Sequence, residues 1–272
     1  MASFSVFDII KLTPKNNCGD CNYATCMAFA VAVVSGNVSI KACPHIDQSV
    51  VESMGIFKEQ PAPAASPDSM LLKELKSKIL DTDFQGIAED LGARLVRDGD
   101  GTDALEIYYL GRTVTVSASN ISSQDGLELD PRDQILLYNY IFFGGKGELS
   151  GEWVGLESFP NSISKVSTLK RYTEDRLSER FGTDIDSLPA LAKKFGARDV
   201  SACYADICIE VPVLPKLPLQ IHLWGAEPDE GFEAKAKVLY DKKAIDFLDL
   251  ESLVFAAERL VEEIIAVEDK NQ

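Results

Sequence analysis

Asn16-Asn17-Cys18-Gly19-Asp20-Cys21-Asn22-Tyr23-Ala24-Thr25-Cys26 brings three cysteines into one short run near the start of the chain. A fourth, Cys43, follows in the segment Lys41-Ala42-Cys43-Pro44, which completes the spacing C-x2-C-x4-C-x16-C. Iron–sulfur clusters are held by cysteine thiolates in uneven spacings of this kind. The sequence therefore predicts that Cys18, Cys21, Cys26 and Cys43 bind an iron–sulfur cube.

The residues between the first cysteines suit a chain wrapped around an inorganic core. Asn16, Asn17 and Gly19 tolerate the positive φ angles of tight turns, so backbone N–H groups can point at sulfur. Pro44 directly after the fourth cysteine prevents that loop from continuing as a helix. We expect a compact loop that encloses the cofactor.

A helix is expected after this loop, because apolar residues recur with helical spacing from Ala24 to Val34. Cys26 shares one face of that helix with Phe29, Ala30 and Val33. Gly36 is in the usual position for a helix C-terminus. The Cys26 sulfur is therefore predicted to face inward.

Four cysteines could also bind structural zinc or form disulfides. Structural zinc sites generally use two close pairs of cysteines, whereas here three cysteines are grouped and one is distant. A disulfide framework needs an oxidising compartment, and the opening Met1-Ala2-Ser3-Phe4-Ser5-Val6-Phe7 lacks the basic start of a secretory signal. Iron–sulfur binding fits the spacing best, and we expect a cytoplasmic protein.

The pattern N-C-G-x-C-x-x-x-T-C-x-A-F-A, followed by a distant C-P, resembles the small N-terminal [4Fe-4S] domain of the corrinoid iron–sulfur protein large subunit and of RnfB-type proteins. The resemblance covers about the first 55 residues and includes the lead-in Lys11-Leu12-Thr13-Pro14-Lys15. It implies that the four cysteines bind one low-potential [4Fe-4S] cluster that moves single electrons in anaerobic metabolism. In the corrinoid relatives the electron re-reduces Co(II) to Co(I), which implies a corrinoid-linked setting.

The remainder of the chain departs from those relatives, because it is too short for their corrinoid-binding part and lacks further ferredoxin-like cysteine repeats. Residues 71–267 instead resemble the DUF3786 domain family. The resemblance rests on D-P-R-D-Q-I-L-L-Y-N-Y-I at 130–141, G-x-W-V-G-L-x-S-F-P at 151–160 and L-P-L-Q-I-H-L-W at 217–224. It implies no catalytic residues.

The domain organisation follows from composition. Residues 60–70 hold three prolines among small residues and form a semi-stiff spacer. We therefore expect a [4Fe-4S] domain at 1–59, a Pro/Ala linker at 60–70 and a DUF3786-like domain at 71–272. Residues 1–60 hold four basic and five acidic side chains, so −15 of the net charge of −16 lies beyond them. Such a body disfavours nucleic acid and anionic membranes as partners.

The predicted fold class is α+β, with a small, mostly helical cluster domain followed by a larger mixed domain. Helices are expected at 69–80, 84–91, 133–143, 174–181, 187–195 and 251–267. Strands are expected at 94–97, 104–110, 112–117, 152–156, 199–202, 207–213, 219–224 and 235–240, with prolines confining 207–224 to an edge or an irregular pairing. No apolar run reaches the length of a membrane span.

An internal duplication is a further hypothesis. Ile87-Ala-Glu-Asp-Leu-Gly-Ala-Arg94 and Leu191-Ala-Lys-Lys-Phe-Gly-Ala-Arg198 are alike, and each precedes a predicted strand and hairpin. A duplicated unit would give a pseudo-twofold domain with a ligand groove between its halves.

Four other residues are candidates for chemistry. Cys203 and Cys208 are interpreted as small buried hydrophobic residues, since a shared metal would require a turn at Ala205-Asp206. His45 is close in sequence to Cys43 and is interpreted as a solvated loop residue that could also tune the cluster. The position of His222 within its strand leaves exposure and burial equally open.

These observations predict a [4Fe-4S] electron-transfer protein whose larger domain docks a redox partner, such as a corrinoid protein. Two alternatives stay open. The larger domain could bind a corrinoid or another cofactor in its groove and receive the electron internally, or the metal site could be purely structural within an interaction module.

Overall fold

The computed structural model describes residues 5–21, 23, 25–35, 38–47, 67–201 and 203–269. The chain divides into two compact units, Met1–Met70 and Leu71–Gln272. Each unit has its own apolar core. Gly36, Ala202 and residues 60–66 of the predicted linker lie outside the described residues.

The first unit is built on two helices, α1 (Val6–Leu12) and α2 (Cys26–Val34), and a 3-10 turn, η1 (Ile40–Ala42). Thr25 caps α2, because its side chain accepts a hydrogen bond of 3.0 Å from the backbone N–H of Ala28. The buried core of this unit consists of Ile9, Phe29, Ala30, Val33, Ile40, Cys43 and Ile46. Helix α2 thus forms where the apolar spacing predicts it, although Ala24 is not described.

Helix α4 (Pro67–Ile79) begins earlier than the sequence suggests. Residues 67–70 therefore belong to a helix rather than to the end of a Pro/Ala linker. Proline is well tolerated in the first turn of a helix, because its missing N–H would have no intrahelical partner there. The third proline of the spacer starts a helix for this reason.

The second unit contains two antiparallel sheets. The first follows the order β1-β2-β3-β4, with strands Arg94–Arg97, Asp103–Tyr109, Arg112–Ser117 and Ile121–Ser123. The second follows the order β5-β9-β8-β7-β6, with strands Trp153–Gly155, Lys235–Asp241, Leu217–Trp224, Ile207–Leu214 and Arg198–Asp199. The two sheets meet where the N–H of Leu110 donates to the carbonyl of Val213 at 3.1 Å.

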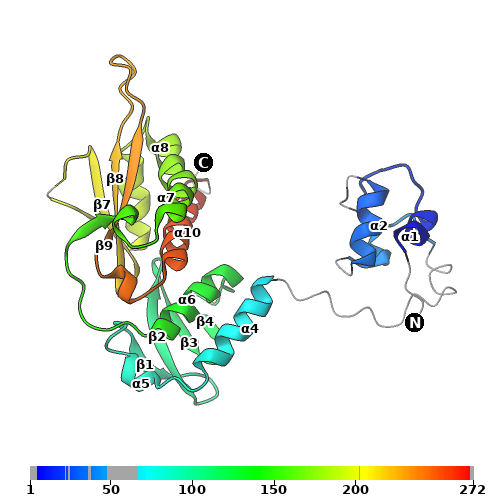
Figure 1. The fold of residues 1–272 in the computed structure, drawn as a ribbon, viewed down its shortest axis with the longest axis horizontal. Helices are drawn as coiled ribbons and strands as arrows, with labels where there is room; N and C mark the ends of the chain where they lie inside the picture. The colour runs from blue at the N-terminus through cyan, green and yellow to red at the C-terminus, as the bar shows by residue number, and fades with distance from the viewer. Residues whose placement is uncertain are drawn as a thin grey trace. The chain divides into compact units, whose positions relative to one another are not determined.

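Helices cover both sheets, and the unit has the predicted α+β architecture. In Figure 1, α7, α8 and α10 lie along one side of β7–β9. The bounds of the helical elements are α5 (Phe84–Ile87), α6 (Pro131–Phe143), η2 (Leu156–Ser158), α7 (Ile163–Leu169), the π-helix η3 (Lys170–Glu174), α8 (Asp175–Phe181), α9 (Ser187–Ala192), η4 (Lys193–Phe195), η5 (Ala244–Asp246) and α10 (Leu250–Asp269). None of the described helices has both the length and the apolar character needed to cross a membrane.

One strand prediction is wrong in part. The prolines of β7 and β8 do disturb the pairing, because the register shifts between Pro212 and Leu214. These strands are nevertheless internal to their sheet, not at its edge. The prolines lie near the turn that joins the two strands, where the ladder can lose a donor at little cost.

The two alike segments occupy equivalent places in the two sheets. Arg94 pairs with Glu106 across β1 and β2, and Arg198 pairs with Glu210 across β6 and β7. Each partner lies 104 positions from its counterpart. Gly92 and Gly196 both have positive φ, at 63° and 75°, and the residue after each donates from its N–H to the carbonyl four residues before that glycine. Helix, left-handed glycine, strand and hairpin thus recur in the same order.

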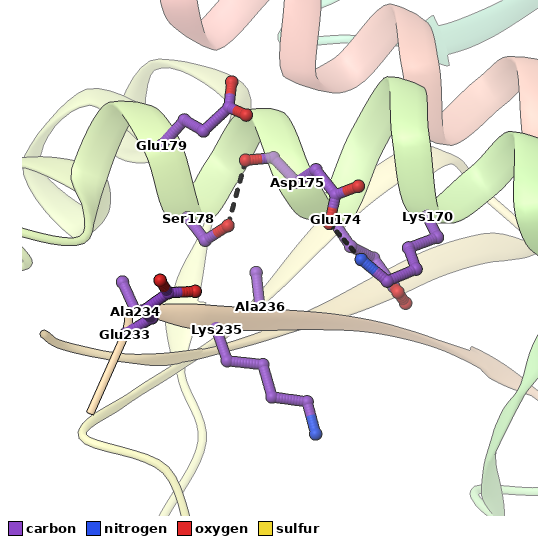
Figure 2. Close-up of a pocket in the computed structure, with 9 residues that line it drawn as sticks. All are labelled: Lys170, Glu174, Asp175, Ser178, Glu179, Glu233, Ala234, Lys235 and Ala236. Carbon is purple, nitrogen blue, oxygen red and sulfur yellow. Dashed lines mark hydrogen bonds and ion pairs between the residues drawn. The ribbon is translucent and has the colours of Figure 1, made fainter. Parts of the chain in front are cut away.

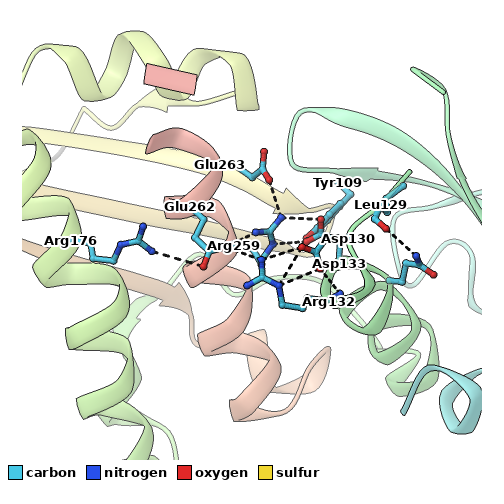
Figure 3. Close-up of polar contacts among 10 residues, drawn as sticks. Tyr109, Leu129, Asp130, Arg132, Asp133, Arg176, Arg259, Glu262 and Glu263 are labelled. Carbon is cyan, nitrogen blue, oxygen red and sulfur yellow. Dashed lines mark hydrogen bonds and ion pairs between the residues drawn. The ribbon is translucent and has the colours of Figure 1, made fainter. Parts of the chain in front are cut away.

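A buried ion pair joins elements that are distant in sequence. Arg259 of α10 donates to both carboxylate oxygens of Asp133 of α6, at 2.7 and 3.1 Å (Figure 3). Tyr109 of β2 donates its hydroxyl to the same carboxylate at 2.7 Å. Helix α10 is thereby tied to the first sheet as well as to the second.

Candidate functional site

The loop that carries the first two cysteines has an unusual backbone. Lys15, Asn17 and Gly19 all have positive φ, at 59°, 52° and 81°. The prediction of left-handed residues is confirmed for Asn17 and Gly19 and is wrong for Asn16, whose φ is not positive, whereas Lys15 was not foreseen. Alternation of left-handed and other residues turns successive N–H groups toward one side and forms a concavity suited to anions, including iron–sulfur sites. The loop is therefore shaped to surround negatively charged sulfur.

Cys26 lies at the first position of α2 and is connected to this loop. Its backbone N–H donates to Oδ1 of Asn17 at 2.9 Å. A hydrogen bond from the backbone of Asn17 lowers the pKa of the Cys26 thiol, and partial burial opposes that effect. Weaker hydrogen bonds from the Thr13 side chain and from the backbones of Lys15 and Asn16 lower the pKa further. Thiolates are the form that binds iron. The prediction that Cys26 faces fully inward is too strong, since the residue is half-buried.

The other three cysteines span the range from surface to core. Cys43 is buried in the apolar core of the first unit, and Cys21 packs against that core. Cys18 is exposed, and all four cysteines are free thiols rather than disulfides. Among the described residues, the ligand atoms that lie within 4.8 Å of one another in this unit are those of Cys18, Asp20 and His45, and the other three cysteines are not part of that group. Cysteine sulfurs are the donors that iron–sulfur clusters use.

His45 and Asp20 connect the Cys43 segment to the Cys18 loop. His45 Nε2 lies 2.6 Å from Oδ2 of Asp20, and a ligating atom of each lies within 4.8 Å of the Cys18 sulfur. The hydrogen bond from His45 lowers the pKa of Asp20, with a smaller effect from Cys18. His45 is exposed, as the sequence suggests, but it has a defined partner. No local pattern in the sequence indicated that pairing.

The second unit brings together three residues, Cys203, Cys208 and His222, that no sequence pattern links. Cys203 and Cys208 form a disulfide, so the interpretation of both as plain hydrophobic residues is wrong. A turn through 204–206, in which the N–H of Ala205 donates to the Cys203 sulfur at 3.3 Å, brings the two sulfurs together. His222 is half-buried opposite Cys208 across the β7–β8 ladder, and burial lowers the pKa of its imidazole.

A cavity of about 540 Å³ lies between η3 and α8 on one side and residues 233–236, at the start of strand β9, on the other (Figure 2). Its charged groups largely compensate one another. Lys170 pairs with Asp175, while Glu174 pairs with Lys237 and accepts the N–H of Val238 at 3.2 Å. This cavity belongs to the second half of the unit alone, so it is not the predicted groove between halves.

Comparison with protein families finds two matches. Residues 14–45 match the family described as "Putative Fe-S cluster", and residues 83–263 match "Domain of unknown function (DUF3786)". The first match contains all four N-terminal cysteines and supports an iron–sulfur cofactor in this segment. It does not specify the type of cluster.

Curated relatives match the N-terminal region. The chain is 40% identical over 47 residues to the corrinoid/iron-sulfur protein large subunit of Moorella thermoacetica, which is 17% of this chain and 10% of that protein. It is 43% identical over 42 residues to the acetyl-CoA decarbonylase/synthase complex subunit gamma of Methanothermobacter thermautotrophicus, covering 15% and 9% of the two chains. The same subunit of Methanocaldococcus jannaschii is 48% identical over 43 residues, covering 16% and 9%.

The match therefore spans only about a tenth of the length of these relatives. No solved structure matches the chain. The match over residues 83–263, by contrast, spans most of this chain and almost all of its second unit. The chain accordingly belongs to the DUF3786 family. In this chain the DUF3786 domain follows a segment that matches an iron–sulfur family.

Proposed function

We propose that the chain is a low-potential electron-transfer protein that holds one [4Fe-4S] cluster on Cys18, Cys21, Cys26 and Cys43. The observation that carries this proposal is the left-handed loop at Lys15, Asn17 and Gly19, whose backbone lowers the pKa of the Cys26 thiol. Uptake and release of single electrons is the chemistry that such a cluster supplies when bound.

The surrounding residues support transfer rather than a purely structural metal. Cys18 is exposed, so one ligand lies at the surface where a partner can approach. Cys43 is buried in the core of the first unit, so this ligand would be shielded from solvent.

Anaerobic purification with electron paramagnetic resonance tests the assignment. We expect about four iron and four sulfide per chain, and a signal after reduction with dithionite. In Cys43→Ser that signal should change or disappear. Zinc without sulfide, or an unchanged signal in the variant, contradicts the proposal.

The partner class is suggested by the relatives, one of which is a corrinoid/iron-sulfur protein. We propose that this chain passes its electron to a cytoplasmic corrinoid protein of anaerobic metabolism. Adding the reduced chain to a Co(II) corrinoid protein should produce the Co(I) absorption spectrum. A persistent Co(II) spectrum rejects the corrinoid partner but leaves the cluster assignment standing.

A further inference from the structure

Three soft-metal ligands converge on the second sheet, far in sequence from the four N-terminal cysteines. Cys208 of β7 lies opposite His222 of β8, and Cys203 approaches from the loop before β7. The two sulfurs and a ring nitrogen of His222 all lie within 4.8 Å of one another. Cys208 is buried, while the other two are half-buried.

The first sheet provides a comparison, because its alike segment, Ile87–Arg94, occupies the equivalent place before β1 and β2. At the register position of the Cys208–His222 pair, the first sheet has Ala104 opposite Ser117. At the spacing of 104 positions, Gly99 corresponds to Cys203. The first sheet thus forms with no cysteine or histidine at the corresponding positions, which favours a role for the three donors beyond packing.

We propose that Cys203, Cys208 and His222 bind a soft divalent metal ion such as zinc when their disulfide is reduced. Thiolate and imidazole are the ligands that zinc prefers. In a tetrahedral site with Zn–S bonds of about 2.3 Å, ligand atoms lie about 3.7 Å apart. Small side-chain movements bring the three donors from their present separations to that value. Three protein ligands leave one position open for water or a substrate.

A chain of polar contacts holds the imidazole in place. His222 Nε2 lies 3.2 Å from Oε1 of Gln220, and Gln220 donates to Oε2 of Glu210 at 3.3 Å. Arg198 in turn donates from Nε to Glu210 at 3.1 Å. Metal-ligating histidines typically donate their second ring N–H to such an outer acceptor, which fixes the tautomer and the orientation of the ring.

The site needs reduction before it binds metal, because a disulfide offers no thiolate. With a water-soluble phosphine as reductant, the disulfide gains two electrons and two protons and becomes two thiols. The phosphine takes up the oxygen of one water molecule as its oxide. The metal ion then displaces the two thiol protons on binding.

The test is a Co²⁺ titration of the full, cluster-loaded chain under anaerobic conditions, before and after phosphine treatment and gel filtration. The reduced chain should bind about one more Co²⁺ than the disulfide form, with sulfur-to-cobalt charge-transfer absorption. Cys208→Ser should lose this extra equivalent. His222→Gln should weaken it by at least about tenfold, whereas His45→Gln, the matched change at the other histidine, should retain it.

Three features of the test separate loss of metal binding from loss of fold. The comparison of reduced and disulfide forms uses the unmutated chain, and Cys203→Ser changes a half-buried residue instead of the buried Cys208. Circular dichroism confirms that each variant is folded. Equal Co²⁺ binding by the reduced and disulfide forms overturns the proposal, and so does an unchanged extra equivalent in both cysteine variants.

Discussion

Asp133 accepts hydrogen bonds from Arg259 and Tyr109 within the core, and both it and Arg259 are almost completely buried. Burial raises the pKa of Tyr109, and the neighbouring carboxylate raises it further, so its hydroxyl stays a donor. Removing one member of a buried pair leaves its partner charged and uncompensated, which costs more than the pair itself contributes.

Asp133→Asn is therefore expected to destabilise the second unit by about 3–5 kcal/mol. Denaturant unfolding followed by tryptophan fluorescence measures this, because both tryptophans, Trp153 and Trp224, lie in the second sheet. Asp130→Asn is the matched control. It changes a more exposed carboxylate that pairs with Arg132 and caps α6, and asparagine also caps well, so the cost should be below about 1 kcal/mol. Equal losses in the two variants would show that Asp133 has no special electrostatic role.

Asp241 illustrates how one side chain connects elements. Its carboxylate accepts hydrogen bonds from the backbone N–H groups of Ser150, Gly151 and Lys243, at 3.0, 2.7 and 2.8 Å. These bonds hold the segment before β5 against the end of β9. Burial raises the pKa of Asp241, but these hydrogen bonds outweigh that effect and leave the pKa below its ordinary value.

The lowered pKa of Asp241 predicts how the free energy of unfolding depends on pH. A carboxyl group whose pKa is depressed by folding stabilises the protein fully above its unfolded pKa of about 3.9, and the stabilisation is lost as the pH falls through the folded pKa. Asp241→Asn should lose about 2–4 kcal/mol at pH 7, because an amide N–H would face backbone donors. Unfolding followed by tryptophan fluorescence should show the difference from wild type shrinking as the pH falls below 4. A difference that is independent of pH would attribute the loss to packing instead.

Several elements could be predicted because their signals are local. Asp130-Pro131 specified the start of α6, since an aspartate cap and a proline in the first turn act within one turn of the chain. Gly111 specified the β2–β3 turn, where its φ is +79°. The candidate cluster residues were also predictable, because the spacing of four cysteines is a sequence property.

Other features depend on contacts that no short segment encodes. A helix is predicted at 174–181, but α7 and the π-helix η3 before it are not, because the exposed Ile163 and Tyr172 weaken the amphipathic pattern. The central place of β7 and β8 arises from pairing with β9, which follows them in the chain. The Cys203–Cys208 disulfide depends on a turn whose residues Tyr204 and Asp206 carry no strong turn signal together.

At the scale of the whole chain, two cores of very different size coexist. Among the described residues, the core cluster of the first unit has seven buried members, and the second unit has a much larger cluster. A single apolar core in a unit of this size rarely supplies more than about 3–5 kcal/mol, and small natural domains often add a structural metal or disulfides. Its four cysteines are therefore expected to contribute to its stability as well as to its chemistry.

Iron removal should consequently act on one unit and spare the other. Hydrogen exchange with mass spectrometry on the cluster-loaded and iron-depleted full chain should show loss of protection in α1 and α2, because their small core no longer has a metal to complete it. Protection in β7, β8 and β9 should be unchanged, since their core contains none of the four cysteines. A Cys18→Ser, Cys43→Ser double variant should reproduce the iron-depleted pattern without a chelator. Full protection of α1 and α2 after iron removal would mean that the apolar core alone suffices, and loss of protection in β7–β9 would mean that the second unit depends on the metal.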